Sequence, residues 1–483
     1  MIKFYNTLSR EKQEFVPIDK KNKIVKMYSC GPTVYNTATI GNLRAYVIAD
    51  ILKKTINAYG YKIYDVMNLT DVGHLVSDGD DGEDKVEKAA RAQGITASEL
   101  AKRYTDQYFV DCEKLNIRRP QVVAPATGFI KQMVDMVEQL EKKGFAYTIK
   151  DGVYFDSSKV PTYNKLSRQP IESNIAGARI AMGEKRNPHD FALWKIVDPK
   201  SLQQWETKWG KHGAPAWHIE CSAIAREFLG DTFDIHTGGI DHIPTHHTNE
   251  IAQTESLTGK PMANFWMHNE FMTVDGKKMS KSLGNGFMLS DIEKKGIDPI
   301  AFRYMCLLTH YRSIFNFTWE GLQSAQTALD NLVKQLARHK VAVKANSLSP
   351  AELGLRLKQS SASSEQASPA TFSPMVVLWD DLNTPRAVAL LWDAVKGAPS
   401  RVVYDMAIAL DSVLSLDLET RVQKFLASQK SADVPKKVLD LAKARHEKKL
   451  AKDWAGADKL RDEVLTLGYI IKDTRDGYEV INK

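Results

Sequence analysis

A strand, a helix and a second strand follow one another within residues 23–69, and this order constrains the fold most. The segment KIVKMYSC, which ends at Cys30, has the apolar character of a short buried strand, and a Gly31-Pro32 turn follows it. Helical spacing of apolar residues predicts a helix over 43–59, and KIYDVMNL then predicts the second strand. Such a unit joins two parallel strands, so we predict an α/β protein with a doubly wound parallel sheet.

Doubly wound sheets bind their ligands at the carboxyl ends of the strands. In this chain Cys30 and residues 68–71 stand at those ends. We therefore expect the functional site at that edge of the sheet.

The bulk composition sets broad limits on the class of protein. A chain of 483 residues predicts several domains, and a formal net charge of +7 permits a nucleic-acid partner without requiring one. Four scattered cysteines do not form a disulfide framework, which indicates a reducing compartment. The sequence shows neither a signal-peptide pattern nor an apolar run long enough to span a membrane, so we expect a cytoplasmic protein.

The chain changes character near Trp319, where apolar residues recur at helical spacing. Residues 358–374 are rich in Ser, Ala and Pro and predict a flexible loop. Near the end, a basic helix or helix pair precedes the predicted hairpin YIIKDTRDGYEVI. These changes divide the chain into an α/β region over 1–318, a helical domain over 319–425 and a small domain over 426–483.

Two segments are candidates for binding phosphate. Residues 31–46 place Thr39-Ile40-Gly41-Asn42 at a helix start, where backbone amides can bind an anion, although this segment alone favours an ordinary capped helix start. Residues 274–285 contain KMSKS in a loop flanked by glycines. Its lysines could neutralise charge that builds on a triphosphate, or could simply be solvated.

A third segment suggests a metal site. His246 and Glu250 are four residues apart on a predicted helix and share one face, whereas His247 is rotated by about 100°. Thiolates from elsewhere in the chain would complete a zinc site. Spacing alone does not select Cys30, and Cys112 and Cys306 lie in apolar helical patterns typical of core packing.

These motifs together resemble a known family. KMSKS resembles the signature loop of class I aminoacyl-tRNA synthetases, and Thr39 to Asn42 occupies the place of their HIGH motif, with Thr39 and Asn42 in place of its two histidines. CGPTVY, WHIECS and GGIDHIPTHHTNEIAQ resemble the zinc segments of cysteinyl-tRNA synthetases. The resemblance covers nearly the whole chain and extends to NLTDVGHL, LSRQ, KRNPHDFALWK, FWMHNEF, DDLNTPRA and KDWAGADKLRD.

The resemblance implies a fold and a set of site residues. The fold would be a class I synthetase Rossmann-type catalytic domain with an inserted connective region, followed by a helical bundle and a small anticodon-binding domain. One zinc ion would be held by Cys30, Cys221, His246 and Glu250. Four further residues would surround bound cysteine, although two of them, His236 and Asp241, could instead orient the metal ligands. The four are Thr70, Trp217, His236 and Asp241.

The implied activity is the ligation of cysteine to tRNA(Cys), using ATP with Mg²⁺ and passing through cysteinyl-adenylate. Thr39, Gly41 and Asn42 would contact phosphates. Lys278 and Lys281 would stabilise the transition state. A zinc–thiolate bond would separate cysteine from serine, which hydrogen bonds alone do poorly. We also expect a monomer without a membrane partner.

Two alternatives remain at this stage. One is a cysteine:amino-sugar ligase of the mycothiol-ligase type, but those enzymes lack the long region that follows Trp319 here. The other is an RNA-binding relative with a lapsed active site, which Thr39 could indicate. The KMSKS loop and all four metal ligands argue against that decay.

Overall fold

The computed structural model describes residues 1–72, 85–169, 184–279, 284–342, 374–432, 434–474 and 477–482. Three parts of the sequence predictions lie outside these ranges: Lys281, Asp476 in the turn of the predicted hairpin, and all but the last residue of the predicted flexible loop over 358–374. The chain divides into two compact units. The first unit combines Met1–Thr327, Pro350–Leu391 and Ser412–Leu416, and the second combines Ala328–Ser349, Trp392–Asp411 and Asp417–Lys483.

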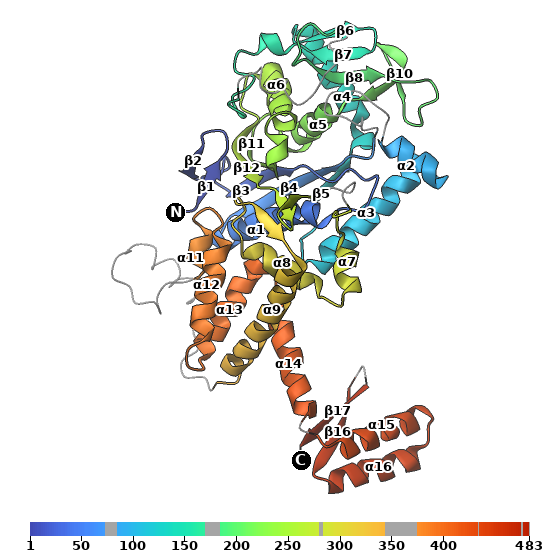
Figure 1. Cartoon of the computed structure of the whole chain (residues 1–483), viewed down its shortest axis with the longest axis vertical. Coiled ribbons are helices and arrows are strands. Elements are labelled where there is room, and N and C mark those ends of the chain that lie inside the picture. Colours follow the sequence, from blue (N-terminus) through green and yellow to red (C-terminus); the bar gives the residue numbers. More distant parts are fainter. Residues whose placement is uncertain are drawn as a thin grey trace. The chain divides into compact units, whose positions relative to one another are not determined.

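The first unit is built on a five-stranded sheet in the order β12-β11-β3-β4-β5, and every pair of neighbours is parallel (Figure 1). The predicted parallel α/β architecture is therefore confirmed. The order reverses between β3 and β11, and ligands of open α/β sheets bind at such a switch point. The strands are β3 (Ile24–Ser29), β4 (Lys62–Leu69), β5 (Val122–Pro125), β11 (Phe233–Gly239) and β12 (Ala263–Asn269).

Helix α1 (Ile40–Tyr59) connects β3 to β4, as the sequence predicts. It begins at Ile40 rather than Leu43 because the side chain of Thr39 caps its first turn. It ends at Gly60, whose φ of 105° is a backbone conformation that glycine adopts without strain.

A long insertion lies between β5 and β11, where the resemblance implies a connective region. It contains a second, five-stranded sheet in the order β6-β7-β8-β10-β9, flanked in sequence by two helices. Helices α4, α5 and α6 contact one another, and their apolar side chains share one core with Tyr28 and Val66 of the parallel sheet. The elements are α4 (Ile130–Lys142), β6 (Ala146–Ile149), β7 (Gly152–Phe155), β8 (Phe191–Ile196), β9 (Trp205–Thr207), β10 (Gly210–Pro215), α5 (Trp217–Leu229) and, after β11, α6 (His246–Thr258).

The remaining elements of the first unit surround the sheet. A three-stranded sheet in the order β14-β13-β15 carries the start of the KMSKS segment. The other elements that lie wholly in this unit are β1 (Lys3–Asn6), β2 (Glu11–Glu14), α2 (Lys85–Gln93), α3 (Ala97–Lys114), β13 (Met272–Val274), β14 (Lys277–Lys278), α7 (Leu289–Lys294), α8 (Pro299–Leu307), β15 (Phe315–Phe317) and α11 (Pro374–Leu378).

The predicted helical character after Trp319 is confirmed by α9 (Trp319–Lys340), α12 (Thr384–Val395), α13 (Arg401–Leu414) and α14 (Leu418–Ala432). The division into domains at 318 and 425 stays a prediction. Among the described residues, no helix has both the length and the apolar character needed to cross a membrane.

The basic C-terminal stretch forms a pair of helices, α15 (Lys436–Leu450) and α16 (Trp454–Thr466). The break between them falls at Lys452, whose φ is 61°, and Asp453 then caps α16 by accepting a bond from the Gly456 amide. The predicted hairpin follows as β16 (Tyr469–Thr474) and β17 (Gly477–Asn482), which pair antiparallel.

Gly31 provides a direct test of the switch-point geometry. The Gly31 amide donates to Asn68 Oδ1 at 2.8 Å, and a Cβ added at Gly31 would lie 1.7 Å from the Asn68 carbonyl oxygen. We expect Gly31→Ala to lower the free energy of unfolding by at least about 1–3 kcal/mol, because the two segments must separate. Gly128→Ala is the matched control, since a Cβ there meets no atom within 4 Å. Equal urea midpoints for the two variants would contradict this contact.

Candidate active site

A cleft opens at the carboxyl ends of β3 and β11, where the sequence predicts the site. Most of the predicted site residues line it, whereas His236 and Glu250 are fully buried and are not among the residues that line it. The structure thus brings the phosphate-binding and metal-binding candidates to one cleft, except Lys281, which lies outside the described residues. The predicted residues in the lining are Cys30, Thr39, Gly41, Asn42, Thr70, Trp217, Cys221, Asp241, His246 and Lys278.

The four predicted metal ligands converge from three elements. Cys30 directly follows β3, Cys221 lies in the second turn of α5, and α6 contributes both other side chains. Helix α6 begins at His246, so Glu250 lies one turn further on the same face, as predicted. One ligand atom from each of the four lies within 4.8 Å of every other. The fold alone brings the two cysteines together, because they are far apart in the sequence.

The spacing of the donor atoms fits a tetrahedral metal ion. The sulfurs of Cys30 and Cys221 are 3.9 Å apart, and two sulfurs bound at about 2.3 Å in a tetrahedral site lie about 3.8 Å apart. His246 Nε2 and Glu250 Oε1 are 3.0 Å apart. Two thiolates, an imidazole and a carboxylate are donors that zinc accepts. The residues present therefore fit a zinc ion.

Electrostatics in the cluster separate the two thiols. Burial raises the pKa of both, and the neighbouring Cys221 raises the pKa of Cys30 further. For Cys221, a hydrogen bond with Cys30 and the charge of His246 outweigh burial and lower its pKa. Although burial opposes both shifts, Glu250 raises the pKa of His246, and His236 and His246 hold the pKa of Glu250 below its usual range. Negative charge thus concentrates on Cys221 and Glu250, which suits a divalent cation.

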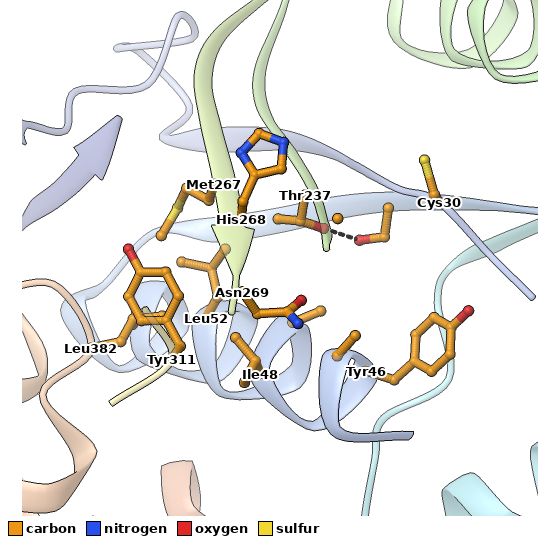
Figure 2. A pocket seen from close by; sticks show the side chains of 14 residues that line it. Cys30, Tyr46, Ile48, Leu52, Thr237, Met267, His268, Asn269, Tyr311 and Leu382 are labelled. Atoms are coloured by element: carbon orange, nitrogen blue, oxygen red, sulfur yellow. Dashed lines mark hydrogen bonds between the residues drawn. The ribbon is translucent and has the colours of Figure 1, made fainter. Parts of the chain in front are cut away.

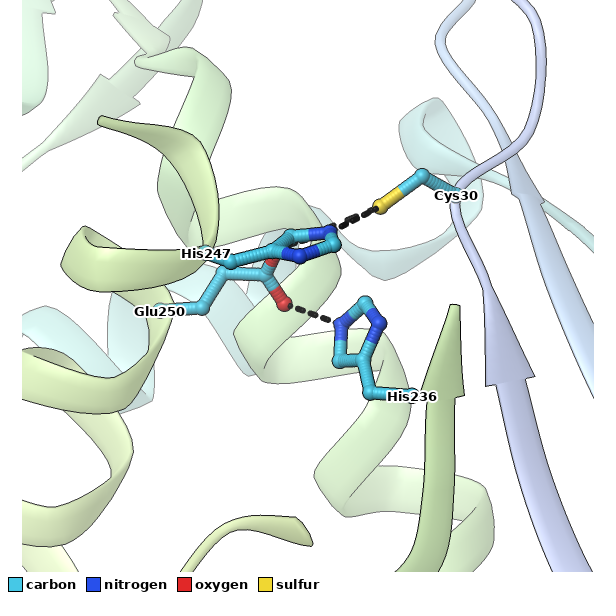
Figure 3. Close-up of side chains that lie close together, drawn as sticks. All are labelled: Cys30, His236, His247 and Glu250. Atoms are coloured by element: carbon cyan, nitrogen blue, oxygen red, sulfur yellow. Dashed lines mark hydrogen bonds and ion pairs between the residues drawn. The ribbon is translucent and has the colours of Figure 1, made fainter. Parts of the chain in front are cut away.

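A second set of donors overlaps the first, since Cys30 and Glu250 also lie within 4.8 Å of His236 and His247 (Figure 3). His236 Nε2 is 2.9 Å from Glu250 Oε2, and His247 Nε2 is 3.4 Å from the sulfur of Cys30. His236 therefore contacts a predicted ligand from the side away from the cleft. This contact favours the alternative in which His236 orients Glu250, and its contact with bound cysteine stays a prediction.

Sequence reasoning noted only that His247 is rotated by about 100° from His246 and did not place it beside the predicted ligands. His247 is fully buried, and its Nδ1 lies 2.8 Å from His268 Nε2. His268 Nδ1 lies in turn 2.8 Å from the hydroxyl of Thr7. The signal that could have shown this was the i, i+3 spacing of His247 and Glu250, which also places two side chains close together on a helix.

Trp217 and Thr70 form part of the cleft wall beside the cluster. The ring of Trp217 stacks on His246 with centroids 4.3 Å apart and thereby fixes the plane of that imidazole. The hydroxyl of Thr70 donates to Glu220 Oε2 at 2.9 Å. Glu220 is fully buried, and burial raises its pKa well above the ordinary value. Glu220 is therefore a second residue that sequence reasoning missed, and it holds Thr70 in place.

The other end of the cleft contains the start of α1, where Thr39 and Asn42 form a capping box. The Thr39 amide and hydroxyl both donate to Asn42 Oδ1, at 3.0 and 2.8 Å, and the Asn42 amide donates back to the hydroxyl at 3.3 Å. Because Oδ1 accepts both bonds, the Asn42 side chain offers its Nδ2 group to other partners. Thr39 thus orients a donor, a role that differs from direct phosphate binding by an imidazole.

The KMSKS segment reaches the same end of the cleft. Lys278 and Met279 both line it, and a Cβ added at Gly41 would lie 3.0 Å from Met279 Cε. Glycine at position 41 therefore lets the two predicted phosphate motifs approach closely.

An inner cavity adjoins the cleft beneath Cys30, between α1 and the ends of β11 and β12 (Figure 2). Its side chains are mostly apolar, among them Ile48, Leu52 and Met267. The hydroxyls of Ser29 and Thr237 pair across its wall at 2.8 Å. Polar side chains also line this cavity, among them His268, Asn269 and Tyr311.

Known proteins resemble the chain over almost its whole length. A family model described as the tRNA synthetases class I (C) catalytic domain matches residues 15–327. The cysteine–tRNA ligase 1 of Burkholderia lata is 42% identical over 98% of this chain and 95% of that protein. The chain belongs to the class I cysteine–tRNA ligase family. Another member, from Treponema denticola, is 40% identical over 98% of both chains. Family membership confirms the resemblance stated from the motifs.

A solved structure supports the fold assignment. Methionyl-tRNA synthetase of Mycobacterium tuberculosis bound by methionyl-adenylate superposes with a TM-score of 0.56, covering 82% of this chain and 93% of that chain. The identity is 13%, so this likeness concerns the fold alone. It confirms the expected class I synthetase fold.

Loss of one thiolate tests the metal cluster. We expect Cys221→Ser to weaken zinc binding at least tenfold, since loss of a group that merely orients a ligand already costs about 10–100-fold. Cys112→Ser is the matched control, because Cys112 is buried in α3 and belongs to neither donor set. Zinc content after dialysis against a chelator measures the effect. Equal zinc retention by both variants would exclude Cys221 as a ligand.

The capping box generates a separate prediction. Thr39→Val removes the hydroxyl while it preserves the side-chain shape, so Asn42 loses one donor and its own amide loses its acceptor. We expect KM for ATP in pyrophosphate exchange to rise about fivefold, the effect of about 1 kcal/mol. Thr39→Ser should retain the wild-type KM. A Val variant that matches the Ser variant would show that the hydroxyl does not position Asn42.

Proposed function

We propose that this chain joins cysteine to tRNA(Cys) in two steps, first forming cysteinyl-adenylate from cysteine and ATP. One observation carries the proposal. Cys30, Cys221 and His246 line the same cleft as the α1 start and the KMSKS segment, and the buried Glu250 completes their cluster. A thiol-selective group and an anion-binding end therefore face one substrate-sized space.

One zinc ion per chain would be held by Cys30, Cys221, His246 and Glu250. When bound, zinc supplies affinity for a thiolate, which distinguishes cysteine from serine. The stacked ring of Trp217 and the contact of His236 with Glu250 keep two of the ligands in fixed orientations. A fixed set of ligands favours one position of the cysteine side chain.

The body of cysteine would occupy the cleft between the cluster and α1. Trp217, Thr70 and Asp241 line this stretch, and each reaches it from a different element. The carboxylate of Asp241 would pair with the amino group of the substrate. His236 would act indirectly, by orienting Glu250. This arrangement would direct the substrate carboxylate toward the end of the cleft at α1.

ATP, with Mg²⁺, would place its phosphates at that end. Asn42 Nδ2, oriented by Thr39, and the close approach at Gly41 would hold them. Lys278, and Lys281 beyond the described residues, would stabilise charge that develops during displacement at the α-phosphorus.

The later part of the chain would bind the RNA. We assign residues 319–425 to a helical tRNA-binding domain and 426–483 to an anticodon-binding domain. The basic helix α15 supports this assignment, because clustered Lys and Arg bind phosphates. We further propose a cytoplasmic monomer.

The amino-sugar ligase is disfavoured by the extent of the match. The cysteine–tRNA ligases of B. lata and T. denticola each match 98% of this chain, which includes the region after Trp319. A lapsed active site is disfavoured because the four metal ligands converge and Thr39 has a defined partner.

Two assays on the purified chain test this function. The first measures cysteine-dependent ATP–pyrophosphate exchange, and the second measures transfer of labelled cysteine to tRNA(Cys). We expect both to be positive, with serine inactive in the first. Exchange without transfer would favour the amino-sugar ligase. Absence of exchange would contradict both enzyme functions.

A further inference from the structure

The segment DDLNTPRA, which begins at Asp380, belongs to neither the metal cluster nor the phosphate-binding motifs. It starts in the turn between α11 and α12, within the first compact unit. In this turn Asp381 and Leu382 have φ angles of 60° and 54°, so both adopt the left-handed conformation. Such angles are uncommon for residues other than glycine and persist where surrounding contacts determine them.

The carboxylate of Asp381 is buried and has a donor at every side. Its Oδ1 accepts from the Tyr5 amide at 2.8 Å and from the Tyr311 hydroxyl at 2.6 Å. Its Oδ2 accepts from Arg312 Nε at 2.9 Å and lies 2.7 Å from Arg312 Nη2. The Arg312 side chain is partly exposed, whereas that of Asp381 is 3% exposed. A buried carboxylate is costly unless it is paired, so these contacts fix where the turn lies.

The backbone of the turn is held by the same segments. The Asp381 amide donates to the Lys3 carbonyl at 2.9 Å, and the Asp381 carbonyl accepts from His310 Nε2 at 2.8 Å. His310 Nδ1 accepts in turn from the Arg312 amide at 3.3 Å. One residue therefore fixes residues 310–312 beside β1, through both its side chain and its backbone.

Residues 310–312 continue into the wall of the cleft. The Glu270 amide donates to the Tyr311 carbonyl at 2.8 Å, and β15 begins four residues after Tyr311. Strand β15 pairs with β13, and β13 pairs with β14, which contains Lys278. Residues 269–273 and Lys278 all line the cleft. The contacts of Asp381 thus reach the small sheet that carries the predicted ATP-binding lysine.

Arg44 holds the same wall from α1. It is fully buried, and its guanidinium donates to the Glu270 carbonyl and, at 3.3 Å, to the Ser313 carbonyl. Its Cζ also lies 5.2 Å from the ring centre of Phe315, which is a favourable place for a cation. Because Arg44 follows Asn42 by two residues, the wall connects the α1 start with the sheet β14-β13-β15.

Packing behind this wall is incomplete. Tyr311 and Leu382 line the inner cavity together with Met267 and Asn269 (Figure 2). Side chains that border a void lack contacts on that side, so they resist displacement less than side chains in a filled core. The hydrogen bonds of Asp381 therefore matter more for the position of the wall than they would in a closely packed region.

We propose that Asp381 is a positioning residue for cysteine activation. Together with Tyr311 and Arg312, it holds the sheet β14-β13-β15 so that Lys278 meets ATP at the α1 start. The inference rests on the proposed function, since it takes ATP as a substrate of this cleft. It also gives part of the region after Trp319 a role in activation, in addition to RNA binding.

Asp381→Asn in the full chain tests this role. The amide keeps an acceptor for Tyr5 and Tyr311 but loses the charge that pairs with Arg312. We expect KM for ATP in pyrophosphate exchange to rise about tenfold, as for loss of a hydrogen bond to a charged group. KM for cysteine and the zinc content should stay within about twofold of wild type, because the metal ligands lie on other elements.

The neighbouring residue provides a matched control. Asp380→Asn removes the same charge, but Asp380 is exposed and pairs with the exposed Lys12 at 2.7 Å. Exposed ion pairs contribute little, so this variant should keep the wild-type KM for both substrates.

Arg312→Met tests the contact from its exposed side and leaves the buried carboxylate unchanged. It should raise KM for ATP as Asp381→Asn does, and the double variant should be no worse than either single variant, because both remove one interaction. An unchanged KM for ATP, an equal rise in KM for cysteine, or a lower kcat alone would overturn the positioning role of Asp381 by itself. Absence of exchange in the wild-type chain would overturn the proposed function and this role together.

Discussion

The site depends on the contacts that the carboxylate of Glu250 makes with two histidines. It is fully buried, with Oε1 3.0 Å from His246 Nε2 and Oε2 2.9 Å from His236 Nε2. A buried carboxylate is costly unless it is paired, and here both oxygens have imidazole partners. One partner comes from α6 and the other from β11, so the charge joins the helix to the switch point of the sheet. The two cysteines then meet beside this fixed anion.

Local sequence predicts much of this framework. Residues 23–69 form β3, α1 and β4 as predicted. The signals for these elements are local: the spacing of apolar residues, and the glycine at position 60 that ends the helix. The His246 and Glu250 pair follows from helical periodicity in the same way. The meeting of Cys30 with Cys221 does not, since it depends on how α5 packs against the sheet. Only the resemblance to a family supplied that pairing before the structure.

The motifs alone did not predict the contacts of His247 and Thr39. His247 Nε2 lies 3.4 Å from the sulfur of Cys30 although His247 is rotated by about 100° from His246, because residues three apart on a helix, such as His247 and Glu250, also lie close. In the sequence, Thr39 stands where the HIGH motif has its first histidine. The structure shows that Thr39 forms a capping box with Asn42. In both cases hydrogen-bond partners decide the role, and residue type alone does not reveal them.

The most direct test of the account concerns the thiol of the substrate. X-ray absorption at the zinc edge counts the sulfur atoms bound to the metal in the zinc-loaded chain. With two protein thiolates as ligands, the account predicts one additional sulfur when cysteine is added and no change when serine is added. A sulfur count that stays the same with cysteine would contradict selection by the cluster.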